Sequence, residues 1–331
     1  MLLTLPLILF IVMAELSIGA FTVLFLLDWR NQVKRSFLVT YTIIYLILTV
    51  LTFLFQQSFS SPDLLNTFLM LDKSWTGYLP LSLLLFLVLM LPYAVFLWLD
   101  KTAGVDGRLK AKEAAVEGTQ RSTLRLLRLI SGGLAILAGM VALFVLGMIF
   151  RPLASTSLAG ALIVGSFFAS ALALGGVMTA MWLGHWYLVT PALSEKPLQF
   201  AATLVLIGIL AQVVFAFTGG LSTATHSQAT NAAVTPAVTA TATPAFSAAT
   251  PANNAQVKPS NAPVVTPLGT DVIGWLRILV AFVLPLILLG FILKLIHDRS
   301  FQSATGMLYL VVVMTLAGEA LARGLFLAGL Q

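Results

Sequence analysis

The chain contains no cysteine and very little charge. Without cysteine, this subunit itself cannot form disulfides, hold a thiolate-ligated iron–sulfur cluster or zinc ion, or use a thiol nucleophile. Charged residues make up only 9% of the sequence. Of the three histidines, His226 and His297 fall in predicted loops and His185 near the end of a hydrophobic segment, so no two can pair across a membrane core. A bis-histidine haem b is therefore not expected.

What the chain has in abundance is apolar surface. Hydrophobic residues make up 59% of its 331 residues, and the mean hydropathy is +1.01. A water-soluble domain of this size cannot bury so much apolar surface, so the composition predicts an all-α, polytopic membrane protein in a lipid bilayer. We find no phosphate-binding loop, dinucleotide fingerprint, zinc-protease motif or nucleophile elbow. Nucleotide and hydrolytic chemistry therefore have no support.

Eight segments are long and apolar enough to cross a bilayer, which takes about 20 residues in a helix. Their approximate bounds are 3–27, 37–58, 78–99, 127–150, 158–183, 197–218, 272–296 and 303–327. No basic residue precedes the first segment, so we expect it to remain in the mature protein and not to be cleaved as a signal peptide.

The basic residues of the loops alternate from one side to the other. Thirteen lie in one set of loops: Arg30, Lys34, Arg35, Lys101, Arg108, Lys110, Lys112, Arg121, Arg125, Arg128, Lys196, Lys294 and Arg299. Only Lys73, Arg151 and Lys258 lie in the other set. Because cytoplasmic loops are enriched in Lys and Arg, both termini are predicted on the outer side of the cytoplasmic (inner) membrane. This distribution also explains the net charge of +6 without a nucleic-acid partner.

Composition divides the chain into three parts. Residues 1–218 form a predicted six-helix membrane region, and residues 271–331 form a two-helix membrane region. Between them, residues 219–270 are rich in Ala, Thr and Pro and nearly uncharged, so we expect a disordered linker on the outer face. The loop 100–126 carries Ala, Glu and Lys and has the composition of a short cytoplasmic helix.

Polar groups inside the spans are the best pointers to function, because a charge in a bilayer costs roughly 2.5–3.5 kcal/mol or more. The candidates in the outer half of the membrane are Glu15, Gln56, Gln212, Arg277, Glu319 and Arg323. Their similar predicted depths would allow them to meet in one pocket. Glu319 and Arg323 are spaced for an i,i+4 ion pair, whereas Glu15 has no cation on its own helix. Two interpretations of these residues remain open: a structural ion pair, and a proton-accepting, quinol-binding site. In the second, Glu15 is the leading proton acceptor.

A second set of candidates lies near the inner face, where the segment from His185 to Pro191 joins the fifth and sixth spans. Trp186 and Tyr187 suit the headgroup layer, so a role in anchoring and turning the chain is one interpretation. In the other, His185 and Tyr187 contact a quinone or relay a proton. No residue pattern predicts a metal site.

Small residues recur every four positions in the fifth span, at Ala161, Gly165, Ala169 and Ala173. This spacing predicts close helix packing and not a ligand site. Prolines inside three spans, Pro80, Pro92 and Pro285, are positions where a helix can kink.

Three stretches resemble the integral-membrane anchor subunits of molybdoenzyme complexes, the dimethyl sulfoxide reductase anchors and the related NrfD/polysulfide reductase anchors. The first, Glu15-Leu-Ser-Ile-Gly19-Ala-Phe21, resembles their opening helix. The second, Gly318-Glu319-Ala-Leu-Ala-Arg323-Gly-Leu-Phe326, resembles their closing helix, and Trp186 to Pro191 resembles their fifth-to-sixth helix junction.

The resemblance implies a quinone- or quinol-interacting anchor of a respiratory or photosynthetic electron-transfer complex. Menaquinone or ubiquinone would be the substrate, no cofactor would be covalently bound, and electrons would pass to a partner iron–sulfur subunit next to a molybdoenzyme-type subunit. The anchor would be non-catalytic alone, as part of a quinol-dependent oxidoreductase. Two alternatives remain open: a secondary transporter or proton-coupled permease, and a structural assembly subunit without a ligand.

Overall fold

A computed structural model describes residues 4–68, 70–106, 118–154, 156–189, 194–232 and 272–328, and these residues are almost entirely helical. Eight of the helices are long and apolar enough to span a membrane, as predicted. The elements are α1 (Thr4–Arg30), α2 (Arg35–Phe59), α3 (Pro62–Leu65), α4 (Lys73–Thr76), α5 (Tyr78–Leu99), α7 (Gly118–Phe150), η1 (Arg151–Leu153), α8 (Ser157–Val189), α9 (Lys196–Ala232), α10 (Val272–Ile278), η2 (Leu279–Val283), α11 (Leu284–His297) and α12 (Phe301–Ala328).

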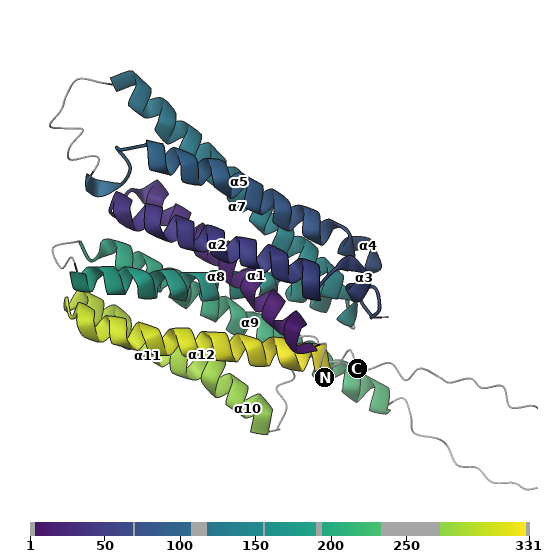
Figure 1. Cartoon of the computed structure of the whole chain (residues 1–331). Coiled ribbons are helices and arrows are strands. Elements are labelled where there is room, and N and C mark those ends of the chain that lie inside the picture. Colours follow the sequence, from purple (N-terminus) through teal and green to yellow (C-terminus); the bar gives the residue numbers. More distant parts are fainter. Residues whose placement is uncertain are drawn as a thin grey trace, which may run out of the picture.

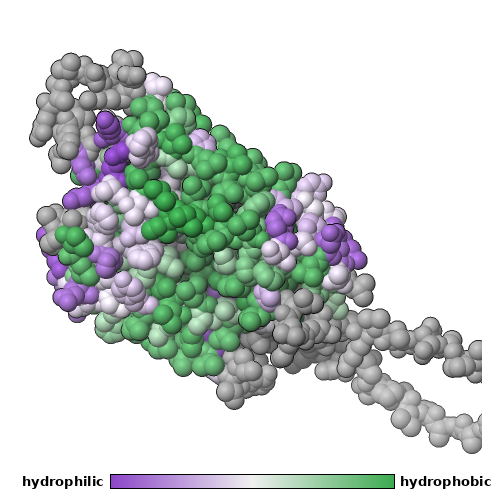
Figure 2. Space-filling model, in the orientation of Figure 1, coloured by the Kyte–Doolittle hydropathy of each residue, from purple (hydrophilic) through white to green (hydrophobic). Residues whose placement is uncertain are grey.

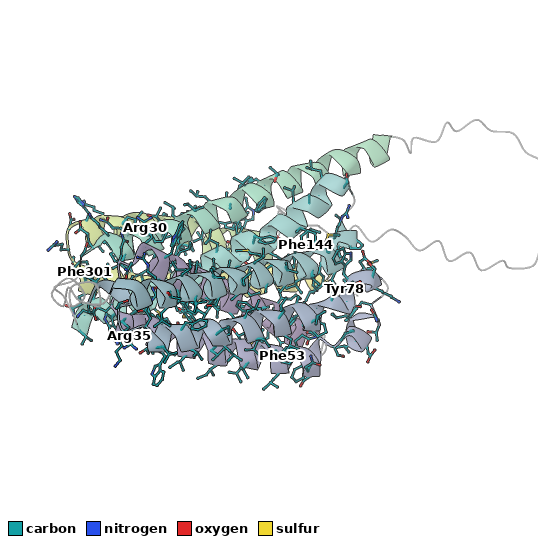
Figure 3. The ribbon with its side chains drawn as sticks, turned by 90° about the horizontal axis from the view of Figure 1, so that it is seen from above. Arg30, Arg35, Phe53, Tyr78, Phe144 and Phe301 are labelled. Carbon is teal, nitrogen blue, oxygen red and sulfur yellow. The ribbon has the colours of Figure 1, made fainter. Side chains whose placement is uncertain are left out.

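The long helices form one bundle in which neighbours in sequence run up and down (Figure 1). Helices α2, α5 and α7 lie on one side, α9, α11 and α12 on the other, and α1 and α8 between them. The last two spans pack directly on α1, α8 and α9, so they belong to the same bundle as the first six. We name the two ends by residues labelled in Figure 3: Arg30, Arg35 and Phe301 lie at the Arg30 end, and Tyr78 lies at the opposite, Tyr78 end.

The outer surface of the bundle has the polarity that a bilayer requires. Figure 2 shows a continuous hydrophobic band between two ends where hydrophilic side chains gather. Large apolar side chains project outward along the length of the peripheral helices, for example Ile43, Ile47 and Leu54 of α2 and Leu85 and Val95 of α5. Exposure of so much apolar surface to water would be unfavourable, whereas lipid chains solvate it. Length, composition and this surface together indicate a multi-pass membrane protein.

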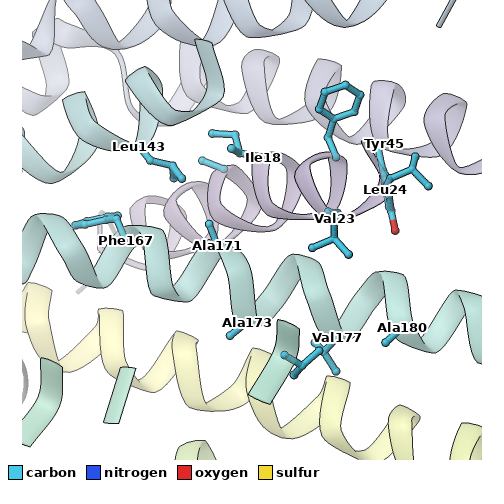
Figure 4. Close-up of a cluster of buried hydrophobic side chains, with 14 of the residues drawn as sticks. Ile18, Val23, Leu24, Tyr45, Leu143, Phe167, Ala171, Ala173, Val177 and Ala180 are labelled. Atoms are coloured by element: carbon cyan, nitrogen blue, oxygen red, sulfur yellow. The ribbon is translucent and has the colours of Figure 1, made fainter. Parts of the chain in front are cut away.

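Helix α1 is the centre of the bundle, with 83% of its span buried compared with 28% for the span Trp275–His297. Its side chains Ile18, Val23 and Leu24 lie among those of the surrounding helices (Figure 4). At Gly19 the backbones of α1 and α8 touch, because an added Cβ would lie 1.7 Å from the carbonyl oxygen of Ala171. Only glycine fits this crossing, as in other membrane helix pairs with small residues at the interface.

The small-residue spacing of α8 also serves packing, as predicted. A Cβ added at Gly208 of α9 would lie 2.7 Å from the backbone nitrogen of Ala173, and one added at Gly165 would touch the ring of Phe215. Because α8 is lined by small residues on both sides, α1 and α9 approach it closely. Gln212 of α9 is thereby brought within hydrogen-bonding distance of Ser170 of α8, at 2.9 Å.

Several helix boundaries differ from the sequence prediction. Helix α9 continues to Ala232, past the predicted end at 218, so the first part of the predicted 219–270 linker is helical. Helix α7 begins at Gly118, within the predicted 100–126 loop. Both extensions contain many polar residues, and a hydropathy criterion marks only the apolar part of a helix, so it ends before the helix does. The remainder of the predicted linker, residues 233–270, lies outside the described residues.

The seventh span crosses the bundle as predicted but is not one regular helix, and its irregular turn lies beside Pro285, one of the three positions where a kink was predicted to be possible. It consists of α10, a π-helical turn at Leu279–Val283 and α11. The turn ends just before Pro285, which lacks the N–H that would bond to the carbonyl of Ala281. Proline therefore supplies the local reason for the wider turn, and such turns are frequent at functional sites.

Candidate functional site: a buried charge cluster beside a small cavity

Arg323 of α12 forms an ion pair with Glu15 of α1 in the interior of the bundle. Glu15 is fully buried, and Arg323 is 5% exposed. The sequence showed no cation on the same span as Glu15. The structure shows that Arg323, on the last helix, is its partner. An ionised pair in this environment is stabilised only when its remaining hydrogen-bonding groups are also satisfied, and the neighbours of Arg323 meet most of that requirement.

Arg323 also binds Glu319, one turn earlier on α12, with 2.8 Å between Nε and Oε1. This is the i,i+4 pair expected from the sequence. Ser170 of α8 donates to Oε1 of Glu319 at 2.9 Å, and Gln212 of α9 donates to Oε2 at 2.9 Å. The Glu319 carboxylate therefore accepts bonds from three helices, and the network ties α8, α9 and α12 together.

The guanidinium of Arg323 lies over the ring of Phe167, 4.0 Å from its centre. This cation–π contact provides a further favourable environment for the buried charge. One oxygen of Glu15, Oε2, has no hydrogen-bond partner among the described residues. Ion pairs thus link Glu15, Arg323 and Glu319, a set in which two carboxylates share one guanidinium.

The fourth charge of this region is Arg277 of α10, which is 8% exposed and forms no ion pair within the described part of the chain. Its Nε has no hydrogen-bond partner there, and its guanidinium lies 5.8 Å from the centre of the Phe282 ring. If all four groups are ionised, Arg277 makes the region neutral overall. Nε of Arg323 also lacks a hydrogen-bond partner among the described residues, but Arg323 has two ion pairs, so Arg277 is the cation of the region without one in the described structure.

Arg277 lines a cavity of about 40 Å³ at the boundary of α8, α9, η2 and α12. The polar residues of its wall are Ser166, Ser170, Gln212, Arg277, Thr315, Glu319 and Arg323, and the others are Ala173, Leu174, Ala281, Phe282, Gly318 and Ala322. This volume holds water-sized molecules. Glu15 is not part of the wall, so Glu319 and not Glu15 is the carboxylate that a ligand in the cavity would meet.

Of the six outer candidates, four line this cavity, Glu15 joins them only through its ion pair with Arg323, and Gln56 lies elsewhere. The amide nitrogen of Gln56 donates to the carbonyl of Ser60 at 3.0 Å, and its oxygen accepts from Gln57 at 2.9 Å. Gln56 thus caps the end of its own helix, α2. The expectation that it joins the same pocket was wrong, because similar depth does not determine which way a side chain faces around its helix.

The candidates predicted near the inner face, His185 and Tyr187, occupy positions that suit an anchoring role. Tyr187 donates to the carbonyl of Ser194, just before α9, and packs against the ring of Phe301 at the start of α12. Trp186 packs edge-on against Phe37, and His185 is exposed at the end of α8. These contacts agree with the anchoring interpretation of this segment.

A second buried charge cluster, at the Arg30 end, was not among the predicted site residues. Arg128 of α7 lies 3.1 Å from Asp28 of α1 and 2.7 Å from Asp100, which follows α5. All three are at most 2% exposed, and Tyr93 donates to Asp28 at 3.1 Å. The sequence signal was present, since Asp28 and Arg128 stand within or beside apolar segments, but Arg128 was counted as a loop charge and Asp28 was not considered.

In the part of the chain that the structure describes, no group of three or more His, Asp or Glu side chains is arranged to hold a metal ion. Comparisons with known protein families and with curated proteins find no match for this chain. The function must therefore be argued from the geometry of the site.

Proposed function

We propose that this protein is a quinone-interacting membrane anchor, and that the quinone headgroup binds between Arg277 and Glu319. The observation that carries the proposal is the buried guanidinium of Arg277, which borders a cavity while retaining an unpartnered Nε. Burying a charge without full hydrogen bonding is costly, so such a group is a candidate for binding a ligand.

The two sides of the cavity match the two redox forms of a quinone. A quinone has carbonyl oxygens that accept hydrogen bonds, as from a guanidinium, and a quinol has hydroxyl groups that donate them, as to a carboxylate. Ala281, Phe282 and Leu174 provide apolar contact for the ring. Glu319 would also be the proton acceptor closest to a bound quinol, a role that the sequence favoured for Glu15.

The cavity as it stands is smaller than a quinone ring, so binding requires one wall to move. The wall formed by Ala281 and Phe282 belongs to the π-helical turn η2 on the least buried span. A peripheral span with an irregular turn is easier to displace than α8, which is held on several sides. We therefore assign entry of the ring to the η2 side, from the lipid.

The remainder of the proposal follows from the sequence. The Lys and Arg bias places both termini on the outer side of the inner membrane, which puts the cavity in the outer half. Without cysteine the chain cannot hold a thiolate-ligated cluster, so electrons from menaquinol or ubiquinol would pass to a partner iron–sulfur subunit of a molybdoenzyme-type complex. This partner assignment rests on the resemblance described above.

The test is binding of a short-chain ubiquinone or menaquinone analogue to the full chain in lipid nanodiscs, measured by quenching of tryptophan fluorescence. Trp275, two residues from Arg277, is 63% exposed and provides a nearby probe. Arg277→Gln is expected to weaken binding about tenfold or more, because a hydrogen bond from a charged group contributes roughly 1.5–3 kcal/mol.

Arg299→Gln is the matched control, since Arg299 is 70% exposed and binds only Glu195 at the Arg30 end among the described residues. It should bind the analogue like the wild type. Unchanged affinity in Arg277→Gln, or no binding by the wild type, would reject the proposal.

A structural subunit without a ligand is the second candidate. It is favoured by the hydrogen bonds that Glu319 receives from Ser170 and Gln212 and by its ion pair with Arg323. In that case Arg277 variants would alter assembly or stability and not quinone binding. Uptake of a substrate by the protein reconstituted alone would instead support a transporter.

A further inference from the structure

The cluster of Asp28, Arg128 and Asp100 at the Arg30 end has an excess of negative charge. Two carboxylates share one guanidinium in a place where each side chain is at most 2% exposed. Asp28 lies 13 residues after Glu15 on α1, about 20 Å away at 1.5 Å per residue, so the two clusters are separate.

The hydrogen bonds within the cluster are unevenly distributed. Asp100 is satisfied on both oxygens, because Oδ2 binds Arg128 and Oδ1 accepts from the backbone and hydroxyl of Thr102 at 2.9 and 2.6 Å. Oδ2 of Asp28 accepts a hydrogen bond from Tyr93 and forms an ion pair with Nε of Arg128, which makes no hydrogen bond among the described residues. Its other oxygen, Oδ1, is buried and has no partner within the described residues.

The next turn of the chain has the same shortage of donors. Oδ1 of Asn31 and Oε1 of Gln32 are also buried and without a hydrogen-bond donor among the described residues. Three acceptor oxygens between residues 28 and 32 thus lack a donor, near the carboxyl end of α1, where the helix dipole adds further negative potential. Buried acceptors are rarely left unpaired. Nε of Arg128 is also without a hydrogen-bond partner, but it does not bond to any of these three oxygens, so each of them still lacks a donor in the described structure.

The other charged groups around Asp28 are already used or exposed. Arg35 of α2 donates to the backbone carbonyls of Asp100 and Trp98, and Arg30 lies over the ring of Phe200 on α9. Arg125, one turn before Arg128 on α7, is exposed to solvent. In the described structure none of these cations forms an ion pair with Asp28.

We propose that Asp28 is a proton-binding site. A proton from the aqueous phase at the Arg30 end adds to Oδ1, forming one O–H bond with no electron transfer, and the cluster becomes neutral. The new hydroxyl supplies the donor that this region lacks. The path from Asp28 to water is short, because the next two residues, Trp29 and Arg30, are exposed.

The test is infrared difference spectroscopy of the full chain in lipid, which detects the C=O stretch of a protonated carboxyl group and its shift in D₂O. Wild type minus Asp28→Asn should show one such band at neutral pH, shifted by D₂O. Glu319→Gln, in the other cluster, should retain the band.

Asp100→Asn provides a second and sharper test. It leaves Asp28 as the only carboxylate facing Arg128, so the pair is balanced and Asp28 should release its proton. The band should therefore disappear although Asp28 is still present. If this variant does not fold, the Asp28→Asn difference alone decides the proposal.

Absence of the band in the wild type would overturn the proposal. A thermal stability that rises with sodium but not with potassium or choline, together with absence of the band, would identify a bound cation in place of the proton.

Discussion

Arg323 binds Glu15 across 308 residues of sequence, so that the last helix of the bundle is tied to the first. The same guanidinium binds Glu319 of its own helix and lies over Phe167 of α8. Arg323 thus contacts side chains from three helices in the membrane interior. Its removal would leave two buried carboxylates without their shared cation.

We predict that Arg323→Gln destabilises the protein by about 3–5 kcal/mol, the range typical when one partner of a buried pair is removed. The measurement is the yield and thermal unfolding of purified protein in detergent. The matched control is Arg299→Gln, which breaks an exposed pair with Glu195 at 3.5 Å and should cost at most about 1 kcal/mol. Equal stability of the two variants would show that the cluster does not hold the bundle together.

The two acids of the cluster should respond differently to replacement by glutamine. Glu319 accepts bonds from Ser170 and Gln212 as well as Arg323, so a glutamine amide there would meet the Gln212 donor or the Ser170 hydroxyl with its own N–H group. Glu15 accepts a hydrogen bond through one oxygen, and the other has no hydrogen-bond partner among the described residues. We expect Glu319→Gln to lower the unfolding temperature more than Glu15→Gln. The reverse order would contradict the described network.

Part of this site could be predicted from the sequence. The Glu319–Arg323 pair lies on one helix, where fixed geometry brings residues four apart together. The partner of Glu15 could not be found in the same way, because it depends on how α1 and α12 are rotated about their axes. That rotation is set by packing, including the contact of Gly19 with Ala171, and hydropathy contains no information about it.

The same limit explains what the sequence missed at the Arg30 end. The eight spans followed from hydropathy, since each has enough apolar residues to cross a bilayer. Asp28 and Arg128 lie at the borders of such spans, where a charged side chain costs little free energy if it faces water. Only the structure shows that they face each other inside the bundle, 3.1 Å apart.

The α1–α8 crossing gives a prediction about packing alone. Gly19→Ala should strongly destabilise the bundle, because the new Cβ would lie 1.7 Å from the Ala171 carbonyl oxygen and 2.5 Å from its carbon. Because backbone atoms of both helices meet at this crossing, no flexible side chain can move aside to make room for the Cβ. Thermal unfolding in detergent is the measurement.

Gly133→Ala is the control for this substitution, since it lies within α7 and a Cβ there has no neighbour within 4 Å. Alanine should stabilise that helix by about 0.5–1 kcal/mol or leave it unchanged. If Gly19→Ala unfolds at the wild-type temperature, α1 and α8 do not cross as described.

The orientation of the bundle is the remaining prediction, and one helix is sufficient to test it. Ser36 and Ser58 are exposed near opposite ends of α2, 22 residues or about 33 Å apart. The bias of Lys and Arg predicts that Ser36 lies on the cytoplasmic side and Ser58 on the outer side. Because the chain has no cysteine, Ser36→Cys and Ser58→Cys introduce single reactive thiols without a background. A membrane-impermeant maleimide added to intact cells should label Cys at 58 and reach Cys at 36 only after the membrane is opened. Labelling of position 36 alone in intact cells would invert the orientation, and the cavity beside Arg277 would then lie in the inner half of the membrane.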